Sequence, residues 1–123
     1  MNVTLWIIAI VLAVVFLMAG LAKVSQPKEK LAEKMGWVED WSPNAVKLIG
    51  AVEILGAIGL VLPAATGVAT VLTPLAATGL AIVMLLAAVV HARRKEQQLI
   101  GVNVVLLVLA AFVAVMRFGP QAF

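Results

Sequence analysis

The chain contains no cysteine and only one histidine, His91. Without cysteine it has no disulfide, no thiolate nucleophile, no cysteine-held iron–sulfur cluster and no cysteine zinc site. One histidine cannot supply a two-histidine metal site or both axial ligands of a haem. The phosphate-binding patterns GxGxxG, GxxxxGKS and GxxxxGKT are also missing, so nothing in the sequence indicates nucleotide binding.

Charged residues are scarce, and apolar residues are abundant. Of the 123 residues, 12% are charged and 64% are hydrophobic, whereas soluble domains average about 25% and about 45–50%. The mean hydropathy is +1.15. A soluble protein this short has too little interior to bury so much apolar surface. The composition therefore excludes an ordinary soluble enzyme, a disordered chain and a disulfide-rich secreted module, and it indicates a membrane protein.

Four apolar segments are long enough to span a bilayer as helices. They cover residues 3–22, about 45–65, a third stretch that ends at 92, and 99–118. Each has about 20 residues, or about 30 Å of helix. Thr73-Pro74 either kinks a long third helix or starts a shorter one, and both alternatives stay open. The short turns between later segments make neighbours antiparallel. The sequence thus predicts a single domain over residues 1–123, an all-α membrane protein with four transmembrane helices in an antiparallel bundle.

The first apolar segment also resembles a secretory signal peptide in its position. It has no positive n-region, and its uncharged run is longer than the roughly 7–15 residues of a signal-peptide core. We therefore expect a retained transmembrane helix.

The loop over residues 23–44 is the one substantial polar segment. Pro27 fits the first position of a short helix over residues 28–35, and Trp37 and Trp41 follow it. We interpret this loop as a short interfacial helix with the two tryptophans as anchors at headgroup depth, where tryptophan is enriched. The alternative is a docking surface for a partner protein.

The chain is basic, with a net charge of +3 and a pI near 9.7. Its cations flank apolar segments instead of forming one stripe, so we expect lipid-headgroup contacts and no nucleic acid partner. The loop over 23–44 has four lysines, and residues 93–95 are all basic, whereas the opposite side has Arg117. The positive-inside rule predicts both basic loops in the cytoplasm and both termini outside, in a plasma or inner membrane.

Glu53 lies in the middle of the second apolar segment. Ser42 and Pro43 predict the start of that helix, and Pro63 and Gly67 mark its end. Glu53 is then about 12 Å into the helix. A carboxylate at that depth is costly unless it is paired or neutral, so we expect it to face the bundle interior.

Small residues surround Glu53 along its helix. Gly50 and Gly56 lie one turn to either side of it on the same face. Small residues let helix backbones approach closely in lipid. We expect these two glycines to leave room for a neighbouring helix or a ligand.

Most of the remaining polar residues belong to the predicted cytoplasmic half of the bundle: Lys23, Lys47, Glu53, His91 and Asn103. The outer half is almost wholly apolar. This asymmetry predicts a polar cluster around Glu53. A lysine stem is long enough, at about 6 Å, for Lys23 to reach down toward it.

Each of these residues also has a purely structural interpretation. Glu53 could serve only to pair helices, although an intramembrane ionisable residue is first of all a functional candidate. Lys23 taken alone is typical of a snorkelling flank. His91, beside two arginines, is better explained as an interfacial residue than as a proton relay. Asn103 is best explained by a hydrogen bond to another helix.

Three motifs, in this order, resemble the DoxX and DoxX-like family of small membrane proteins. They are GLAKV at residues 20–24, GAVEILGAIGLVLP at 50–63, and PLAATGLAIVMLLAAVVHARRKE at 74–96. The resemblance implies a four-helix membrane bundle with Lys23 and Glu53 as the family's polar positions. Family members include a thiosulfate:quinone oxidoreductase subunit and a complex that handles oxidative stress beside soluble partners. The fold family also resembles eukaryotic receptor-assembly chaperones.

Three functions are compatible with these features. The first is a membrane subunit or anchor of an oxidoreductase, with a quinone-sized apolar pocket near Glu53. The chain lacks cysteine and a metal-cluster site, so a bound quinone or a soluble or membrane redox partner would carry the electrons. We expect no activity from the chain by itself. The second is an assembly or chaperone-type protein that contacts other membrane proteins or a second copy. A small-molecule or proton-coupled carrier ranks last, because no inverted repeat is evident.

Overall fold

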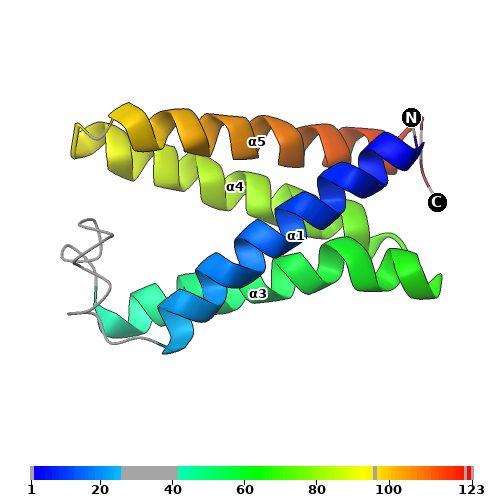
Figure 1. The fold of residues 1–123 in the computed structure, drawn as a ribbon, viewed down its shortest axis with the longest axis horizontal. Helices are drawn as coiled ribbons and strands as arrows, with labels where there is room; N and C mark the ends of the chain where they lie inside the picture. Colours follow the sequence, from blue (N-terminus) through cyan, green and yellow to red (C-terminus); the bar gives the residue numbers. More distant parts are fainter. Residues whose placement is uncertain (1, 26–41, 96, 121, 123) are drawn as a thin grey trace.

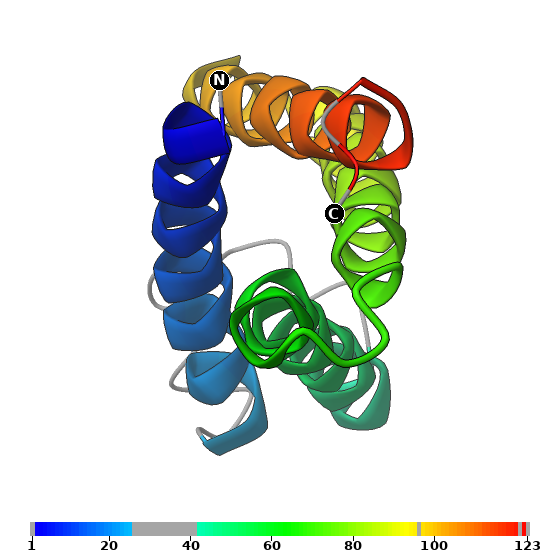
Figure 2. The ribbon, with the colours of Figure 1, turned by 90° about the vertical axis from the view of Figure 1, so that its right-hand side faces the viewer.

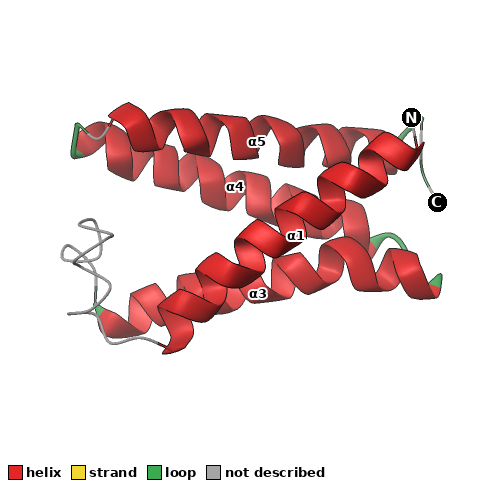
Figure 3. Cartoon of the chain, in the orientation of Figure 1, coloured by secondary structure: helices red, strands yellow, loops and turns green. Residues whose placement is uncertain are grey.

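The computed structural model describes residues 2–25, 42–95, 97–120 and 122. These residues form helices and turns, and no strand. The four helices are α1 (Asn2–Ser25), α3 (Pro43–Thr66), α4 (Leu72–Arg93) and α5 (Gln97–Phe118), and all four are long and apolar enough to cross a membrane (Figure 3). The predicted interfacial helix over 28–35, with Trp37 and Trp41, lies outside the described residues.

The ends of α3 follow the local chemistry of the sequence. Ser42 is the N-cap, and its Oγ accepts a hydrogen bond from the Ala45 backbone N–H at 3.1 Å. Pro43 occupies the first turn, where its missing N–H is not needed. At the other end, Gly67 adopts a left-handed φ of 72° and donates its N–H to the Pro63 carbonyl at 2.9 Å. Pro63 therefore lies within the last turn instead of ending the helix.

The proline at the start of the third apolar segment begins a helix and does not kink one. α4 starts at Leu72, after a turn over residues 67–71, so Pro74 falls in its first turn. Buried Thr73 donates its hydroxyl to the Leu60 carbonyl at 3.4 Å. This contact joins the start of α4 to α3.

The helices run alternately up and down, as predicted. α1 packs along α3, and α4 packs along α5 (Figures 1 and 2). We call the end of the bundle that carries Ser25, Pro43, Arg93 and Gln97 the basic end. The start of α1 and the finish of α5 lie at the opposite, terminal end (Figure 1). The two helix pairs are separated at the basic end, whereas α1 approaches α5 at the terminal end (Figure 1).

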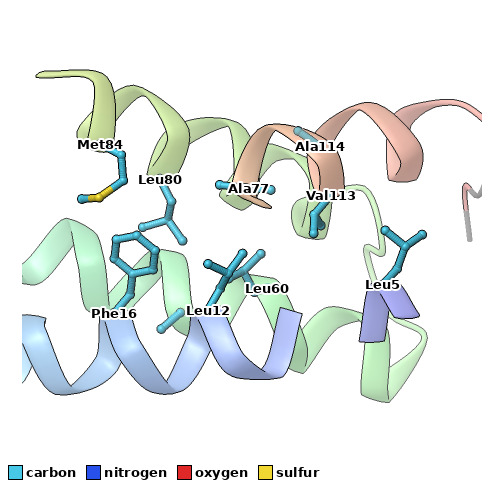
Figure 4. Close-up of a cluster of buried hydrophobic side chains, with 11 residues drawn as sticks. Leu5, Leu12, Phe16, Leu60, Ala77, Leu80, Met84, Val113 and Ala114 are labelled. Carbon is cyan, nitrogen blue, oxygen red and sulfur yellow. The ribbon is translucent and has the colours of Figure 1, made fainter. Parts of the chain in front are cut away.

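All four helices contribute to one apolar core. Leu12 and Phe16 of α1 meet Leu60 of α3, Leu80 of α4 and Val113 of α5, and each is exposed by 1% or less (Figure 4). The outward faces carry exposed valine, leucine and isoleucine side chains along the helices. A chain that is apolar both inside and outside is suited to lipid as its surroundings.

Candidate functional site

An ion pair inside the bundle joins α1 to α3. The Nζ of Lys23 lies 2.8 Å from Oε1 of Glu53. Lys23 is 7% exposed and Glu53 is 2% exposed. Although the ammonium is close, Oε1 accepts no hydrogen bond of regular geometry from the described residues. The structure therefore pairs these two residues, as the sequence predicted. Oε1 keeps the capacity to accept another hydrogen bond.

Two facing glycines bring α1 and α3 close enough for this pair to form. A Cβ at Gly20 would come within 2.6 Å of the Gly50 carbonyl oxygen, and a Cβ at Gly50 within 2.8 Å of the Gly20 carbonyl oxygen. Lys23 and Glu53 each follow one of these glycines by three residues, on helices that run in opposite directions. Side chains lean toward the N-terminus of their own helix, so these two lean toward each other.

The second glycine beside Glu53 serves a different helix. A Cβ at Gly56 would lie 2.6 Å from Leu80 Cδ2, on α4. Gly50 and Gly56 thus leave room for α1 and for α4, respectively. Of the two uses expected for these glycines, the structure shows helix packing.

A cavity of about 270 Å³ opens beside the ion pair, between the two helix pairs. All four helices contribute to its walls, which are mostly apolar, and the lining residues are Lys23, Ile49, Glu53, Val83, Met84, Leu86, Ala87, Val90, His91 and Asn103. The cavity therefore combines an apolar body with a few buried polar groups, as small-molecule sites commonly do.

Asn103 and His91 supply the polar groups from the other helix pair. Asn103 is 8% exposed and donates its Nδ2–H to Met84 Sδ at 3.4 Å, a hydrogen bond from α5 to α4. The interhelical hydrogen bond expected for Asn103 is therefore present, although sulfur is a weak acceptor. His91 is 7% exposed and lines the cavity. Its side chain is buried within the bundle in the last turn of α4, and its interfacial depth in the membrane stays a prediction.

Two other cations, Lys47 and Arg117, do not line the cavity. Lys47 is exposed and does not line the cavity, so it stands apart from the other four residues of the cluster. Arg117, in the last turn of α5, is only 5% exposed. The sequence already placed this arginine on the outer side, and the structure adds that it is buried. A single cation at a helix end is typical of a topology signal, so the sequence alone did not predict that Arg117 is buried.

The chemistry open to this site is that of a neutral polar pocket in an apolar body. Lys23 and Glu53 offset each other's charge, so a ligand that binds beside them need not be ionic. Among the described residues no three histidine, cysteine, aspartate or glutamate side chains are grouped to hold a metal ion. The groups available to a ligand are hydrogen-bond donors and acceptors.

A comparison with protein-family models matches the DoxX-like family over residues 7–113. The chain belongs to the DoxX-like family. The matched region includes all four polar residues of the cavity, Lys23, Glu53, His91 and Asn103, but not Arg117. No curated protein and no solved structure matches the chain significantly.

Proposed function

We propose that this DoxX-like protein is a non-catalytic membrane subunit or anchor of a redox or oxidative-stress system, and that its cavity binds a quinone or a similar lipid-like molecule. The observation that carries the proposal is a buried ion pair in the wall of an apolar cavity. Ionisable residues inside membranes are costly and are kept mainly where they serve function.

The residues of the cavity suit a neutral, hydrogen-bonding headgroup. The Lys23 ammonium and the Asn103 amide can donate to carbonyl oxygens, and Glu53 Oε1 can accept from a hydroxyl. The apolar side chains of α4 would contact the ring. A bound quinone would supply the two-electron chemistry that the side chains of this chain do not have. Partner proteins would supply and remove the electrons, and both basic loops would face them from the cytoplasm.

The test is native mass spectrometry of the full chain extracted gently from its own membrane. We expect a bound quinone or lipid-like molecule in the parent chain and its loss in Glu53→Gln and Lys23→Met. Lys47→Met is the matched control, because it removes a lysine that lies outside the cavity. Retention of the ligand in both cavity variants would overturn the proposed site.

A different result would favour an assembly role. If the chain carries no small molecule and copurifies only with membrane proteins that have no redox cofactor, or with a second copy of itself, the redox proposal fails. Lys23 and Glu53 would then be a helix-pairing contact. Recovery of the same partner proteins with Glu53→Gln would show that the ion pair is not needed to bind them.

A further inference from the structure

Eight of the ten residues that line the cavity belong to α3 and α4, and we call the line along which these two helices face each other the α3–α4 seam. Toward the terminal end these helices are in tight contact, because a Cβ at Gly59 would lie 2.9 Å from the Ala76 Cβ and one at Gly56 would meet Leu80. Toward the basic end the two helices separate (Figure 1). There Ile49 of α3 and Val83 and Leu86 of α4 line the cavity.

The exposed fraction of the lining side chains rises from the polar residues of the cavity to the side chains at this seam. Glu53 is 2% exposed, and Asn103 is 8% exposed. Leu86, by contrast, is 60% exposed, while Ile49, Val83 and Val90 are half-buried. The cavity is therefore polar at its buried side and apolar at its outer lip.

The lip lies at the depth of the acyl chains. Leu86 is seven residues before Arg93, the last residue of α4, which is about 10 Å along the helix axis. α4 is long and apolar enough to cross a membrane. An opening beside Leu86 consequently faces lipid and not water.

The volume of the cavity limits what it encloses. At about 270 Å³ it is below the range of about 300–1,000 Å³ that holds whole drug-sized ligands. A single ring or headgroup suits this volume, whereas an amphiphile with a long chain does not.

From these four observations we infer that the cavity takes only the headgroup of a tailed amphiphile, which arrives from the bilayer through the α3–α4 seam beside Leu86 and leaves its tail among the lipids. The inference rests on the proposed function and adds to it the route and the shape of the ligand. Glu53 and Lys23 contact the headgroup, and Leu86 controls passage.

The test compares two neighbouring leucines in the full chain reconstituted in lipid nanodiscs. Leu86→Trp narrows the mouth, whereas Leu85→Trp places the same bulk on an equally lipid-facing leucine, 53% exposed, that does not line the cavity. The probes are benzoquinones substituted with butyl and decyl chains, at concentrations expressed per lipid. We expect Leu86→Trp to weaken binding at least about tenfold, and Leu85→Trp and Leu86→Ala to change it by less than about threefold.

The length of the tail gives a second, independent measurement. If the tail stays in lipid in both the free and the bound state, butyl and decyl probes bind with affinities within about threefold of each other. A much tighter decyl probe would mean that protein encloses the tail, which overturns the inference.

The outcomes separate the inference from the proposed function. If Glu53→Gln loses binding while Leu86→Trp binds normally, the entry route beside Leu86 is overturned and the binding site at Glu53 is kept. Equal loss in Leu85→Trp and Leu86→Trp also overturns the mouth, because the effect would then come from helix packing. Failure of the parent chain to bind either probe overturns both.

Discussion

The stem of Lys23 passes directly over Gly50. A Cβ at Gly50 would come within 2.8 Å of the Lys23 Cβ, and within 2.8 Å of the Gly20 carbonyl oxygen. Lys23 has to cross from α1 to reach Glu53 on α3, and any side chain at position 50 would stand in its path. The close helix contact and the buried ion pair are therefore one structural unit.

Alanine at either of these glycines is expected to destabilise the protein. Gly20→Ala and Gly50→Ala would each force the α1 and α3 backbones apart, and Gly50→Ala would also displace the Lys23 stem. Overpacking of this kind costs about 1–3 kcal/mol. The free energy of unfolding in mixed micelles, followed by helical circular dichroism, measures the loss.

Two other glycines of the bundle provide the controls. A Cβ at Gly79 or at Gly101 would meet no atom of another element within 4 Å. Gly79→Ala and Gly101→Ala should therefore change the unfolding free energy by less than about 1 kcal/mol. An equal effect at all four positions would show that loss of helix flexibility matters here and close packing does not.

Substitutions at Glu53 should differ according to charge. Glu53→Gln keeps the shape and an acceptor for Lys23, whereas Glu53→Lys puts a second ammonium within a few ångströms of the first. Breaking a buried pair by removing one partner costs about 3–5 kcal/mol, and we expect the lysine variant to reach that range and the glutamine variant to stay below it. Expression level and thermal stability in detergent measure both. Equal values for the two variants would contradict a buried pair.

Exchanging the lysine and the glutamate tests whether attraction between their charges stabilises the protein. The double variant Lys23→Glu/Glu53→Lys restores opposite charges, so it should be more stable than either single variant. Lys47→Glu serves as the control, since Lys47 is exposed. A double variant whose destabilisation equals the sum of the single effects would mean that the two residues do not interact.

The sequence was sufficient for the fold and for grouping Lys23, Glu53, His91 and Asn103, although it also grouped Lys47 with them, and Lys47 does not line the cavity. Long apolar runs predict membrane helices because lipid leaves the backbone no other partners, and Glu53 had to find a partner among very few polar residues. The burial of His91 was not predictable in the same way, because its neighbours Arg93 and Arg94 are typical of a membrane surface. His91 lines the cavity between the two helix pairs, which separate at the basic end. That separation depends on how the helices pack together, which the sequence of a single helix does not predict.

Asn103 is expected to contribute little to stability, because its observed acceptor is weak. Its Nδ2 donates to Met84 Sδ at 3.4 Å, and interhelical hydrogen bonds in membranes average about 0.6 kcal/mol. Asn103→Leu should change the unfolding free energy by less than about 1 kcal/mol. Asn103→Asp should cost more, since it brings an anion into the same cavity as Glu53.

Gln98, exposed at the start of the same helix, is the control for both changes. Gln98→Leu and Gln98→Asp should leave stability nearly unchanged. A large loss in Asn103→Leu would mean that the amide is mainly a structural contact, which would remove it from the proposed headgroup site.

The orientation in the membrane can be measured directly because the chain has no cysteine of its own. Val68, in the turn between α3 and α4, and Gln98, at the start of α5, are both exposed, and they lie at opposite ends of the bundle. The basic residues 93–95 are next to Gln98, so the positive-inside rule places that end in the cytoplasm. A membrane-impermeant maleimide applied to intact cells should therefore label Val68→Cys and not Gln98→Cys, and both should react after permeabilisation. The reverse pattern would put the basic turn outside, and with it the end of the bundle nearest the cavity, so that a cytoplasmic redox partner would have no access to it.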